Sequence, residues 1–117
     1  MEKGRLMQSM LLDFYGELLT DKQRECFELH YNEDLSLAEI AEELCISRQG
    51  VWDNIRRAEA SMQAMEDKTG LIRRFSDTQS ALSALHGQLG RLAGMCQGEA
   101  RELARAAEAA VEALLEA

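Results

Sequence analysis

The sequence of 117 residues contains no proline, and aromatic residues make up only 5% of it. Strands are usually rich in aromatic and β-branched residues, whereas alanine, leucine and glutamate favour helices. This chain has many residues of the second kind and few of the first, so its composition predicts an all-helical protein and argues against a large sheet. Its hydrophobic content of 46% is high enough for a buried core, and its size fits one compact domain or a small domain with a helical arm.

Long apolar runs are also missing. No segment approaches the roughly 20 apolar residues that a membrane-spanning helix needs, and the charged N-terminus does not resemble a secretory signal. Cys26, Cys45 and Cys96 are widely spaced and include no CxxC pair, and His30 and His86 belong to no cluster with metal-ligand spacing. We therefore predict a cytoplasmic protein without disulfides, membrane insertion, metal or cofactor, and we do not expect an enzyme.

Basic charge is scarce, because 13 Lys and Arg residues stand against 21 Asp and Glu residues and give a formal net charge of −8. Proteins that bind nucleic acid over their whole surface are usually basic, since neutralising phosphates supplies most of the affinity. This chain cannot bind nucleic acid in that way. Any contact with nucleic acid must come from a local basic patch on an acidic body.

Helical periodicity is the strongest pattern present. Apolar residues recur at intervals of three and four over residues 6–19, which predicts an amphipathic N-terminal helix. Three hydroxyl residues then stand where further helices are expected to begin, namely Thr20, Ser36 and Ser47. Gln23 and Glu39 each follow a cap by three residues and complete a capping box. The last of these helices is expected to continue to about Asp67, before a stop signal at Gly70.

The two middle helices predict a helix-turn-helix. About three residues join the helix over 36–44 to the helix that begins at Ser47, and Ala41 is the small residue that such a crossing needs. Apolar residues on both inner faces are expected to form the shared core: Ile40, Leu44, Ile46, Val51 and Ile55. Cys45 holds the turn position that most such motifs fill with glycine, where a left-handed residue with a side chain costs roughly 1–2 kcal/mol. Either Cys45 accepts that strain or the turn adopts another shape.

The outward face of the second helix carries residue types that read DNA. We predict that the nucleic-acid-binding residues are Ser47, Arg48, Gln49, Asp53, Asn54, Arg56 and Arg57. Arginine pairs with guanine or phosphate, and glutamine and asparagine pair with adenine. From Ser47 to Ala58 three arginines stand against one aspartate, a net charge of +2 on an acidic chain. Asp53 suits DNA least; its carboxylate could accept from a cytosine amino group or interact with Arg56 or Arg57 within the helix.

The segment after Gly70 has a different character. Ser76 is a candidate cap for a further helix, and apolar residues at three–four spacing over 82–96 suit a helix–helix seam. Three glycines lie four residues apart in this region: Gly90, Gly94 and Gly98. Either these glycines let another helix approach closely, or the helix breaks at the last two of them. Residues 99–117 are rich in alanine and glutamate and predict a peripheral helix that depends on a neighbour for stability.

The caps, the turn and the outward face together resemble region 4 of bacterial sigma factors, and more closely the YlxM family of sigma-like helix-turn-helix proteins. The segments that carry the closer resemblance are Leu18-Leu19-Thr20-Asp21-Lys22-Gln23, Ser47-Arg48-Gln49 and Asp53-Asn54-Ile55. The resemblance covers about residues 6–75, and the tail after Ser76 does not match the family pattern. We therefore expect an all-α fold of the sigma region 4 type. A domain over 1–70 is expected to add an N-terminal helix to the helix-turn-helix, and 71–117 to form a helical extension.

The same resemblance implies a small, dimeric, cytoplasmic protein whose gene neighbours that of the signal recognition particle GTPase, with a regulatory role in that pathway. A homodimer is also expected because Met62, Met65 and the apolar stripe over 82–92 would otherwise stay exposed. Trp52, like these methionines, is interpreted as a core or dimer-seam residue. Two functions stay open. One is a regulator that binds DNA weakly, and the other is a protein- or RNA-interaction module that modulates the signal recognition particle GTPase without binding DNA.

Overall fold

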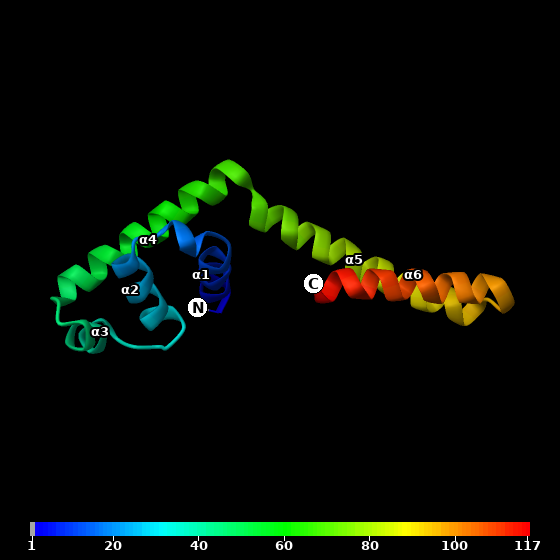
Figure 1. Ribbon diagram of the computed structural model, residues 1–117, viewed down its shortest axis with the longest axis horizontal. Helices are drawn as coiled ribbons and strands as arrows, with labels where there is room; N and C mark the ends of the chain where they lie inside the picture. Colours follow the sequence, from blue (N-terminus) through cyan, green and yellow to red (C-terminus); the bar gives the residue numbers. More distant parts are fainter. Residues whose placement is uncertain (1) are drawn as a thin grey trace. The chain divides into compact units, whose positions relative to one another are not determined.

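The computed structural model describes the backbone of residues 2–117 and the side chains of residues 4–117, so Met1, with which the predicted first domain begins, lies outside the described residues. Every regular element of the described chain is helical, which confirms the predicted all-α class (Figure 1). The elements are α1 (Glu2–Tyr15), the 3-10 turn η1 (Gly16–Leu18), α2 (Asp21–Tyr31), α3 (Leu37–Leu44), α4 (Arg48–Thr69), α5 (Leu71–Met95) and α6 (Gly98–Glu116). The chain forms two compact units, which meet in sequence between Ile72 and Arg73.

The three predicted hydroxyl caps begin their helices as expected. The Thr20 hydroxyl accepts a 3.2 Å hydrogen bond from the Gln23 backbone N–H, and the Gln23 side chain accepts one of 3.2 Å from the Thr20 N–H. Ser36 and Glu39 form the same reciprocal pair at 3.1 and 2.9 Å. The Ser47 hydroxyl accepts a 2.9 Å bond from the N–H three residues on. Because these N–H groups have no partner within their helices, the caps fix where α2, α3 and α4 begin.

One core holds the first unit together, because α1, α2 and α3 each pack against α4. The largest fully buried side chains of this core are Leu11, Cys26, Phe27, Ile40, Val51, Met62 and Ile72. Met62 is 1% exposed, and Met65 is partly buried against the same core. The expectation that these two methionines stay exposed was therefore wrong: α1 covers the part of α4 that the helix-turn-helix alone would leave bare.

The turn between α3 and α4 shows that Cys45 adopts the strained left-handed conformation and that the turn does not take another shape. Cys45 adopts a left-handed conformation with φ 57° and ψ 43°, and its backbone N–H donates to the carbonyl of Ala41. The N–H of Ile46 donates to the same carbonyl at 3.1 Å. Cys45 thus accepts the strain of a position that favours glycine, and the short turn that orients α4 is kept.

The junction between α4 and α5 corrects the expected cap at Ser76. Gly70 ends α4 in a left-handed conformation with φ 62°, and α5 begins directly at Leu71 and continues through Ser76. Side chains of α4 supply the acceptors that the start of α5 needs. The Thr69 hydroxyl accepts from the first N–H of α5 at 3.3 Å, and the Glu66 carboxylate accepts from the second at 3.0 Å. Because these N–H groups already have partners, the helix begins five residues before Ser76.

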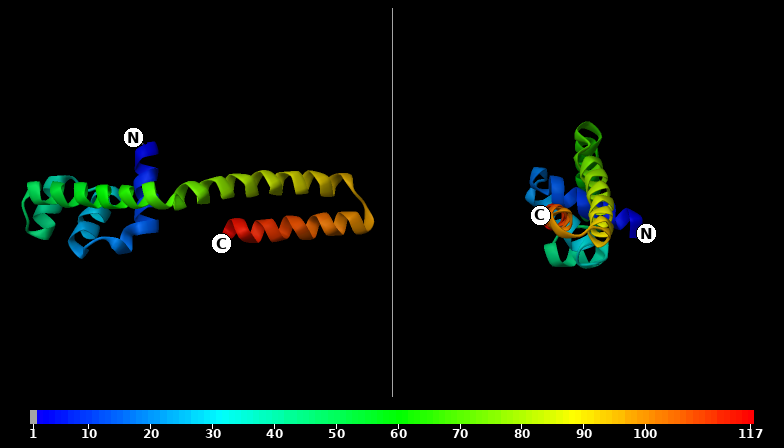
Figure 2. Two further views of the ribbon diagram at one scale, coloured as in Figure 1. Left: turned by 90° about the horizontal axis from the view of Figure 1, so that it is seen from above. Right: turned by 90° about the vertical axis from the view of Figure 1, so that its right-hand side faces the viewer.

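The second unit is a helical hairpin in which α5 and α6 lie side by side and antiparallel (Figure 1 and Figure 2). Its buried residues are the small or branched side chains Ala93, Ala104 and Val111. The helix breaks at the last of these glycines, because α5 ends at Met95 and Gly98 begins α6 with φ 62°. A Cβ atom on Gly90 would lie 2.9 Å from Glu108 Oε2, so one side chain of α6 reaches this glycine, whereas a Cβ atom on Gly94 or Gly98 would have no atom within 4 Å.

Candidate nucleic-acid interface

The pair α3 and α4 forms the predicted helix-turn-helix. Ile40 and Ala41 are buried on the inner face of α3, and Val51 and Ile55 are buried on the facing side of α4. Leu44 and Ile46 pack against the same core while staying partly exposed. This shared core orients α4 so that the opposite side of its first three turns is in contact with solvent.

Most of the predicted site residues lie on that exposed side. The exposed ones are Ser47, Arg48, Gln49, Asp53, Arg56 and Arg57. The Ser47 hydroxyl is already engaged as the helix cap. Asn54 differs from the others: it is half-buried, and its amide donates a 2.8 Å hydrogen bond to the backbone carbonyl of Gly50. Its side chain therefore bonds back onto α4, which leaves less of its amide for an outside partner.

Asp53 has a partner that its sequence position did not indicate. The Gln49 amide nitrogen donates a 3.1 Å hydrogen bond to Asp53 Oδ1, one turn farther along α4. Among the described residues, no ion pair joins Asp53 to Arg56 or Arg57. The single carboxylate of this face is thus held by an amide, and the charges of both arginines stay available.

The arginines of α4 differ in how they are held. Arg48 and Arg57 form no ion pair within the described part of the chain. Arg56 places its guanidinium carbon 5.2 Å from the centroid of the Trp52 ring, a cation–π contact. Three positive charges are therefore exposed on α4, Arg48 in its first turn and Arg56 and Arg57 two turns later, and no ion pair within the described residues neutralises them.

Trp52 is the residue of this face that the sequence interpretation missed. It was interpreted as a core or dimer-seam residue; its 44% exposure excludes the core, and it lies one turn from both Gln49 and Arg56. Helical spacing contained this information, since residues three and four apart share a helix face. The size and apolarity of tryptophan favoured the interior instead.

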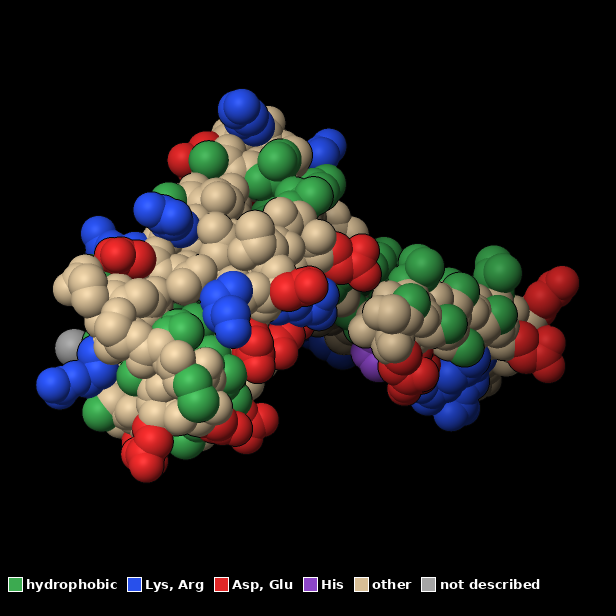
Figure 3. Space-filling model, turned by 60° about the vertical axis from the view of Figure 1, so that its left-hand side comes forward, with side chains coloured by type: hydrophobic (Ala, Val, Ile, Leu, Met, Phe, Trp, Pro, Cys, Tyr) green, Lys and Arg blue, Asp and Glu red, His purple; other side chains and the backbone are tan. Residues whose placement is uncertain are grey.

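The surroundings of this face are acidic. All three charged residues of α3 are exposed glutamates, namely Glu39, Glu42 and Glu43. The first 72 residues contain eight Lys and Arg against fifteen Asp and Glu, a net charge of −7. On the face of the first unit in view in Figure 3, basic side chains alternate with acidic and apolar ones and form no continuous basic field. The positive stretch of α4 is therefore local.

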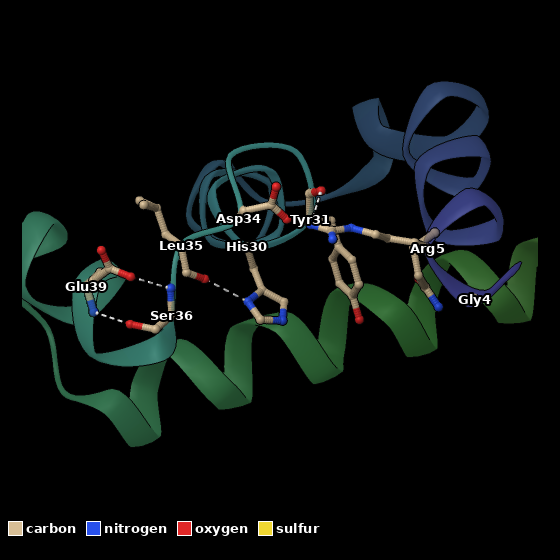
Figure 4. Close-up of a pocket in the computed structure, with 9 residues that line it drawn as sticks. Gly4, Arg5, His30, Tyr31, Asp34, Leu35, Ser36 and Glu39 are labelled. Atoms are coloured by element: carbon tan, nitrogen blue, oxygen red, sulfur yellow. Dashed lines mark hydrogen bonds and ion pairs between the residues drawn. The ribbon is translucent and has the colours of Figure 1, made fainter. Parts of the chain in front are cut away.

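A hollow of about 700 Å³ lies between α1, the end of α2 and the loop before α3 (Figure 4). Arg5 reaches across it to the Asp34 carboxylate and donates a 3.3 Å hydrogen bond to the Tyr31 carbonyl. His30 is half-buried, and its Nδ1 lies 3.0 Å from the carbonyl oxygen of Leu35. Arg5, Asp34 and His30 already have partners in the protein, and these contacts connect α1, α2 and the loop before α3. The hollow therefore offers none of these charges unpaired to a ligand.

Two ionisable groups beside the hollow have shifted pKa values. Burial, followed by the 2.6 Å hydrogen bond that the Tyr31 hydroxyl donates to Glu59, raises the pKa of Tyr31 to about 12. The backbone N–H of Ser36, which donates to the Glu39 carboxylate, lowers the pKa of Glu39. Both pKa shifts favour the protonation states that these hydrogen bonds need, with Tyr31 protonated toward Glu59 and Glu39 ionised toward Ser36.

The described part of the chain offers neither a metal site nor a membrane-spanning helix. Its His, Cys, Asp and Glu side chains form no group of three that could hold a metal ion. None of its helices is both long and apolar enough to cross a membrane.

Comparison with known proteins gives the family. A UPF0122 protein of Thermoanaerobacter sp. (strain X514) is 49% identical over 85 residues, which cover 73% of each chain. A UPF0122 protein of Acetivibrio thermocellus is 57% identical over 67 residues, or 57% of each chain, and one of Bacillus thuringiensis is 51% identical over 75 residues, or 64% of this chain and 68% of its own. The family profile matches residues 1–96, which extends the similarity beyond 6–75 to the end of α5. The chain belongs to the UPF0122 family, described as "Putative helix-turn-helix protein, YlxM / p13 like".

Proposed function

We propose that this protein is a cytoplasmic helix-turn-helix regulator that binds duplex DNA weakly through α4. The observation that supports this proposal is the position of Arg48, Arg56 and Arg57. All three are exposed on a helix whose inner side is fixed in the core, and the described chain gives none of them a carboxylate partner. A rigid, locally positive helix of this kind fits the major groove.

The N-terminal turns of α4 supply the proposed base contacts. In helix-turn-helix proteins the first residues of the second helix reach base edges, and the first helix crosses the phosphate backbone. Arg48 then contacts a base edge, and Gln49, held by Asp53, lies beside it. Arg56 and Arg57 lie two turns later, where they neutralise phosphates.

The same surroundings make the proposed binding weak and sensitive to salt. The exposed Glu42 and Glu43 of α3 and the net charge of −7 over residues 1–72 repel phosphates that flank the contact. Fluorescence anisotropy with labelled random and promoter-derived duplexes, repeated over a range of salt concentrations, tests the proposal. Counterion release favours binding most at low salt, so the absence of binding at about 20 mM salt contradicts it.

The acidic character of α3 also favours a second function. A helix-turn-helix with three exposed glutamates beside its basic face fits a basic protein partner better than it fits a phosphate backbone. In this case the protein acts on the signal recognition particle GTPase through protein or RNA contacts without binding DNA, as the family resemblance implies. A pull-down from native lysate, with and without nuclease, separates the two functions. Recovery of particle components favours this second function, and recovery of a promoter fragment favours the first.

The proposal includes a homodimer in which residues 71–117 serve as the dimerisation arm, separate from a DNA-binding domain over 1–70. Its support no longer comes from Met62 and Met65 but from large apolar side chains of the second unit. Leu85, Leu92, Met95, Leu103 and Leu114 are each between 41% and 80% exposed. Such side chains favour burial against a second copy. Sedimentation that finds only a 13.1 kDa species at tens of micromolar protein excludes the dimer at that concentration.

A further inference from the structure

Trp52 occupies an unusual place for its residue type. Tryptophan side chains are large and are strongly buried on average, yet this one is 44% exposed on the second turn of α4. It lies on the same face as Gln49 and Arg56, between residues that carry hydrogen-bonding groups. A large apolar ring in the middle of a polar recognition face is a feature that the core of this protein does not require.

The contacts of Trp52 show that the ring belongs to this face. The guanidinium group of Arg56 lies 5.2 Å from the ring centroid. Gln49, one turn earlier, bonds to Asp53 and not to the indole. Arg56 therefore restrains the ring by a cation–π contact and leaves part of the indole exposed.

The major groove of duplex DNA limits what such a ring can bind. Paired bases stack on each other, so an indole on a helix in the groove does not insert between them without unstacking the duplex. The edges that bases present in the groove are hydrogen-bonding groups, with one apolar exception, which is the C5-methyl group of thymine. The apolar face of the indole ring therefore has one matching chemical group in this environment.

We propose that Trp52 determines specificity in the DNA interface by packing its indole ring against the C5-methyl group of a thymine. The inference rests on the proposed DNA binding through α4 and adds the kind of base that α4 reads. Burying one methyl group accounts for about a fourfold change in affinity. Arg56 contributes by holding the ring in place. Its charge then neutralises a phosphate while the neighbouring ring contacts the thymine.

The sequence provides a direct reporter, because Trp52 is the only tryptophan of the chain. Duplexes selected from a randomised pool are titrated into the full-length protein while labelled-DNA anisotropy and intrinsic fluorescence are recorded together. Each thymine of the selected site is then replaced by uracil, which removes the methyl group and keeps the base-pairing edge. We expect one replacement to weaken binding about fourfold, and we expect the tryptophan emission to change on binding.

The Trp52→Ala variant completes a double-mutant cycle. It should bind the selected duplex more weakly and lose the difference between thymine and uracil at that one position, while replacements at other positions keep their effects. Circular dichroism checks that the variant is folded, and Trp52→Phe, which keeps an aromatic ring, should retain part of the discrimination.

The outcomes distinguish this inference from the function on which it rests. Duplex binding that is indifferent to every uracil replacement contradicts the role of Trp52 and leaves DNA binding intact. Absence of binding to any duplex at low salt contradicts both. A change in tryptophan emission with single-stranded RNA, and none with duplex DNA, overturns the inference and assigns the ring to an unpaired base instead.

Discussion

The hydroxyl group of Tyr15 donates a 2.7 Å hydrogen bond to Glu66 Oε1 and thereby joins α1 to the end of α4. The same carboxylate oxygen accepts the 3.0 Å bond from the backbone N–H of Ile72, and the Tyr15 hydroxyl also lies 2.5 Å from the Thr69 hydroxyl. Tyr15 is only 3% exposed. A partly buried network therefore connects α1, the last turn of α4 and the first residues of α5.

Tyr15→Phe should lower the free energy of unfolding by about 1–2 kcal/mol, because Glu66 loses a donor while the ring still fills its place. Urea denaturation followed by Trp52 fluorescence measures the change in the first unit. Tyr31→Phe is the matched control, since it also removes a hydroxyl that donates to a carboxylate, but at a half-buried site where water can replace it. Equal losses in the two variants would show that burial of the Tyr15 network adds nothing.

Alkaline pH should destabilise the protein through its tyrosines. Burial and the bond to Glu59 raise the pKa of Tyr31 to about 12, and burial also raises the pKa of Tyr15. In the unfolded chain a tyrosine ionises near pH 10, so the folded state holds its phenolic protons more tightly. The resulting stability is complete below about pH 10 and is lost as the pH rises through about 12. Unfolding measured across this range should show a steeper fall for the wild type than for Tyr31→Phe.

The arginines of α4 should differ in what their loss does to DNA binding. Arg48→Ala is expected to cost about 1–3 kcal/mol on a preferred duplex and to relax its sequence preference. Arg57→Ala should weaken binding to all duplexes alike and lower the slope of affinity against salt by about one. Arg56→Ala should lower the slope by the same amount and also reduce the preference for thymine, because Arg56 holds the Trp52 ring. Arg105→Ala is the matched control, because Arg105 lies in the second unit, where it pairs with Glu108. An equal effect of Arg105→Ala would indicate general electrostatics and not a site on α4.

Local signals explain why so much of the first unit could be predicted. A capping box is complete within four residues, so Thr20 and Ser36 mark the start of α2 and α3 without reference to the rest of the chain. The same holds for the pattern of apolar residues on the inner faces of α3 and α4. The exposure of Arg57 follows from that pattern, since it points away from the side of α4 that carries Val51 and Ile55, and Arg48 is exposed in the first turn of the helix.

The errors concern features that depend on contacts between distant residues. Ser76 was expected as a cap, but the side chains of Glu66 and Thr69 already supply acceptors to the first N–H groups of α5. Met62 is buried by packing between helices that its own sequence neighbourhood does not reveal. Trp52 is the converse case, because its exposed side chain excludes a place in the core, one of the two places expected for it, and is compatible with the other, a dimer seam.

The strain at Cys45 can be measured by substitution. Cys45→Gly should raise the free energy of unfolding by about 1 kcal/mol, because glycine adopts the left-handed conformation at φ 57° without the steric cost of a Cβ atom. Cys45→Ala keeps the Cβ atom and should give no such gain. Both variants lose the 3.9 Å contact from Cys45 Sγ to the Glu42 carbonyl, so their difference isolates the backbone strain. Urea denaturation gives both values, and equal stability of the two variants would contradict the prediction.

The helical hairpin offers a second matched pair of substitutions, at two glycines inside α5. Gly87 has no atom within 4 Å of the position that a Cβ would occupy, so Gly87→Ala should stabilise the hairpin by about 1 kcal/mol through helix propensity alone. At Gly90 the new methyl group would lie 2.9 Å from Glu108 Oε2, and that carboxylate would have to move.

Moving Glu108 disturbs its 2.8 Å ion pair with Arg105. Because the Arg105 side chain is half-exposed, this ion pair contributes no more than about 1 kcal/mol to stability. The cost is of the same order as the gain in propensity, so Gly90→Ala should stabilise the hairpin less than Gly87→Ala or leave its stability unchanged. Thermal unfolding followed by circular dichroism compares the two variants with the wild type. If Gly90→Ala stabilises as much as Gly87→Ala, the carboxylate moves freely, and the position of Glu108 beside α5 does not require glycine at residue 90.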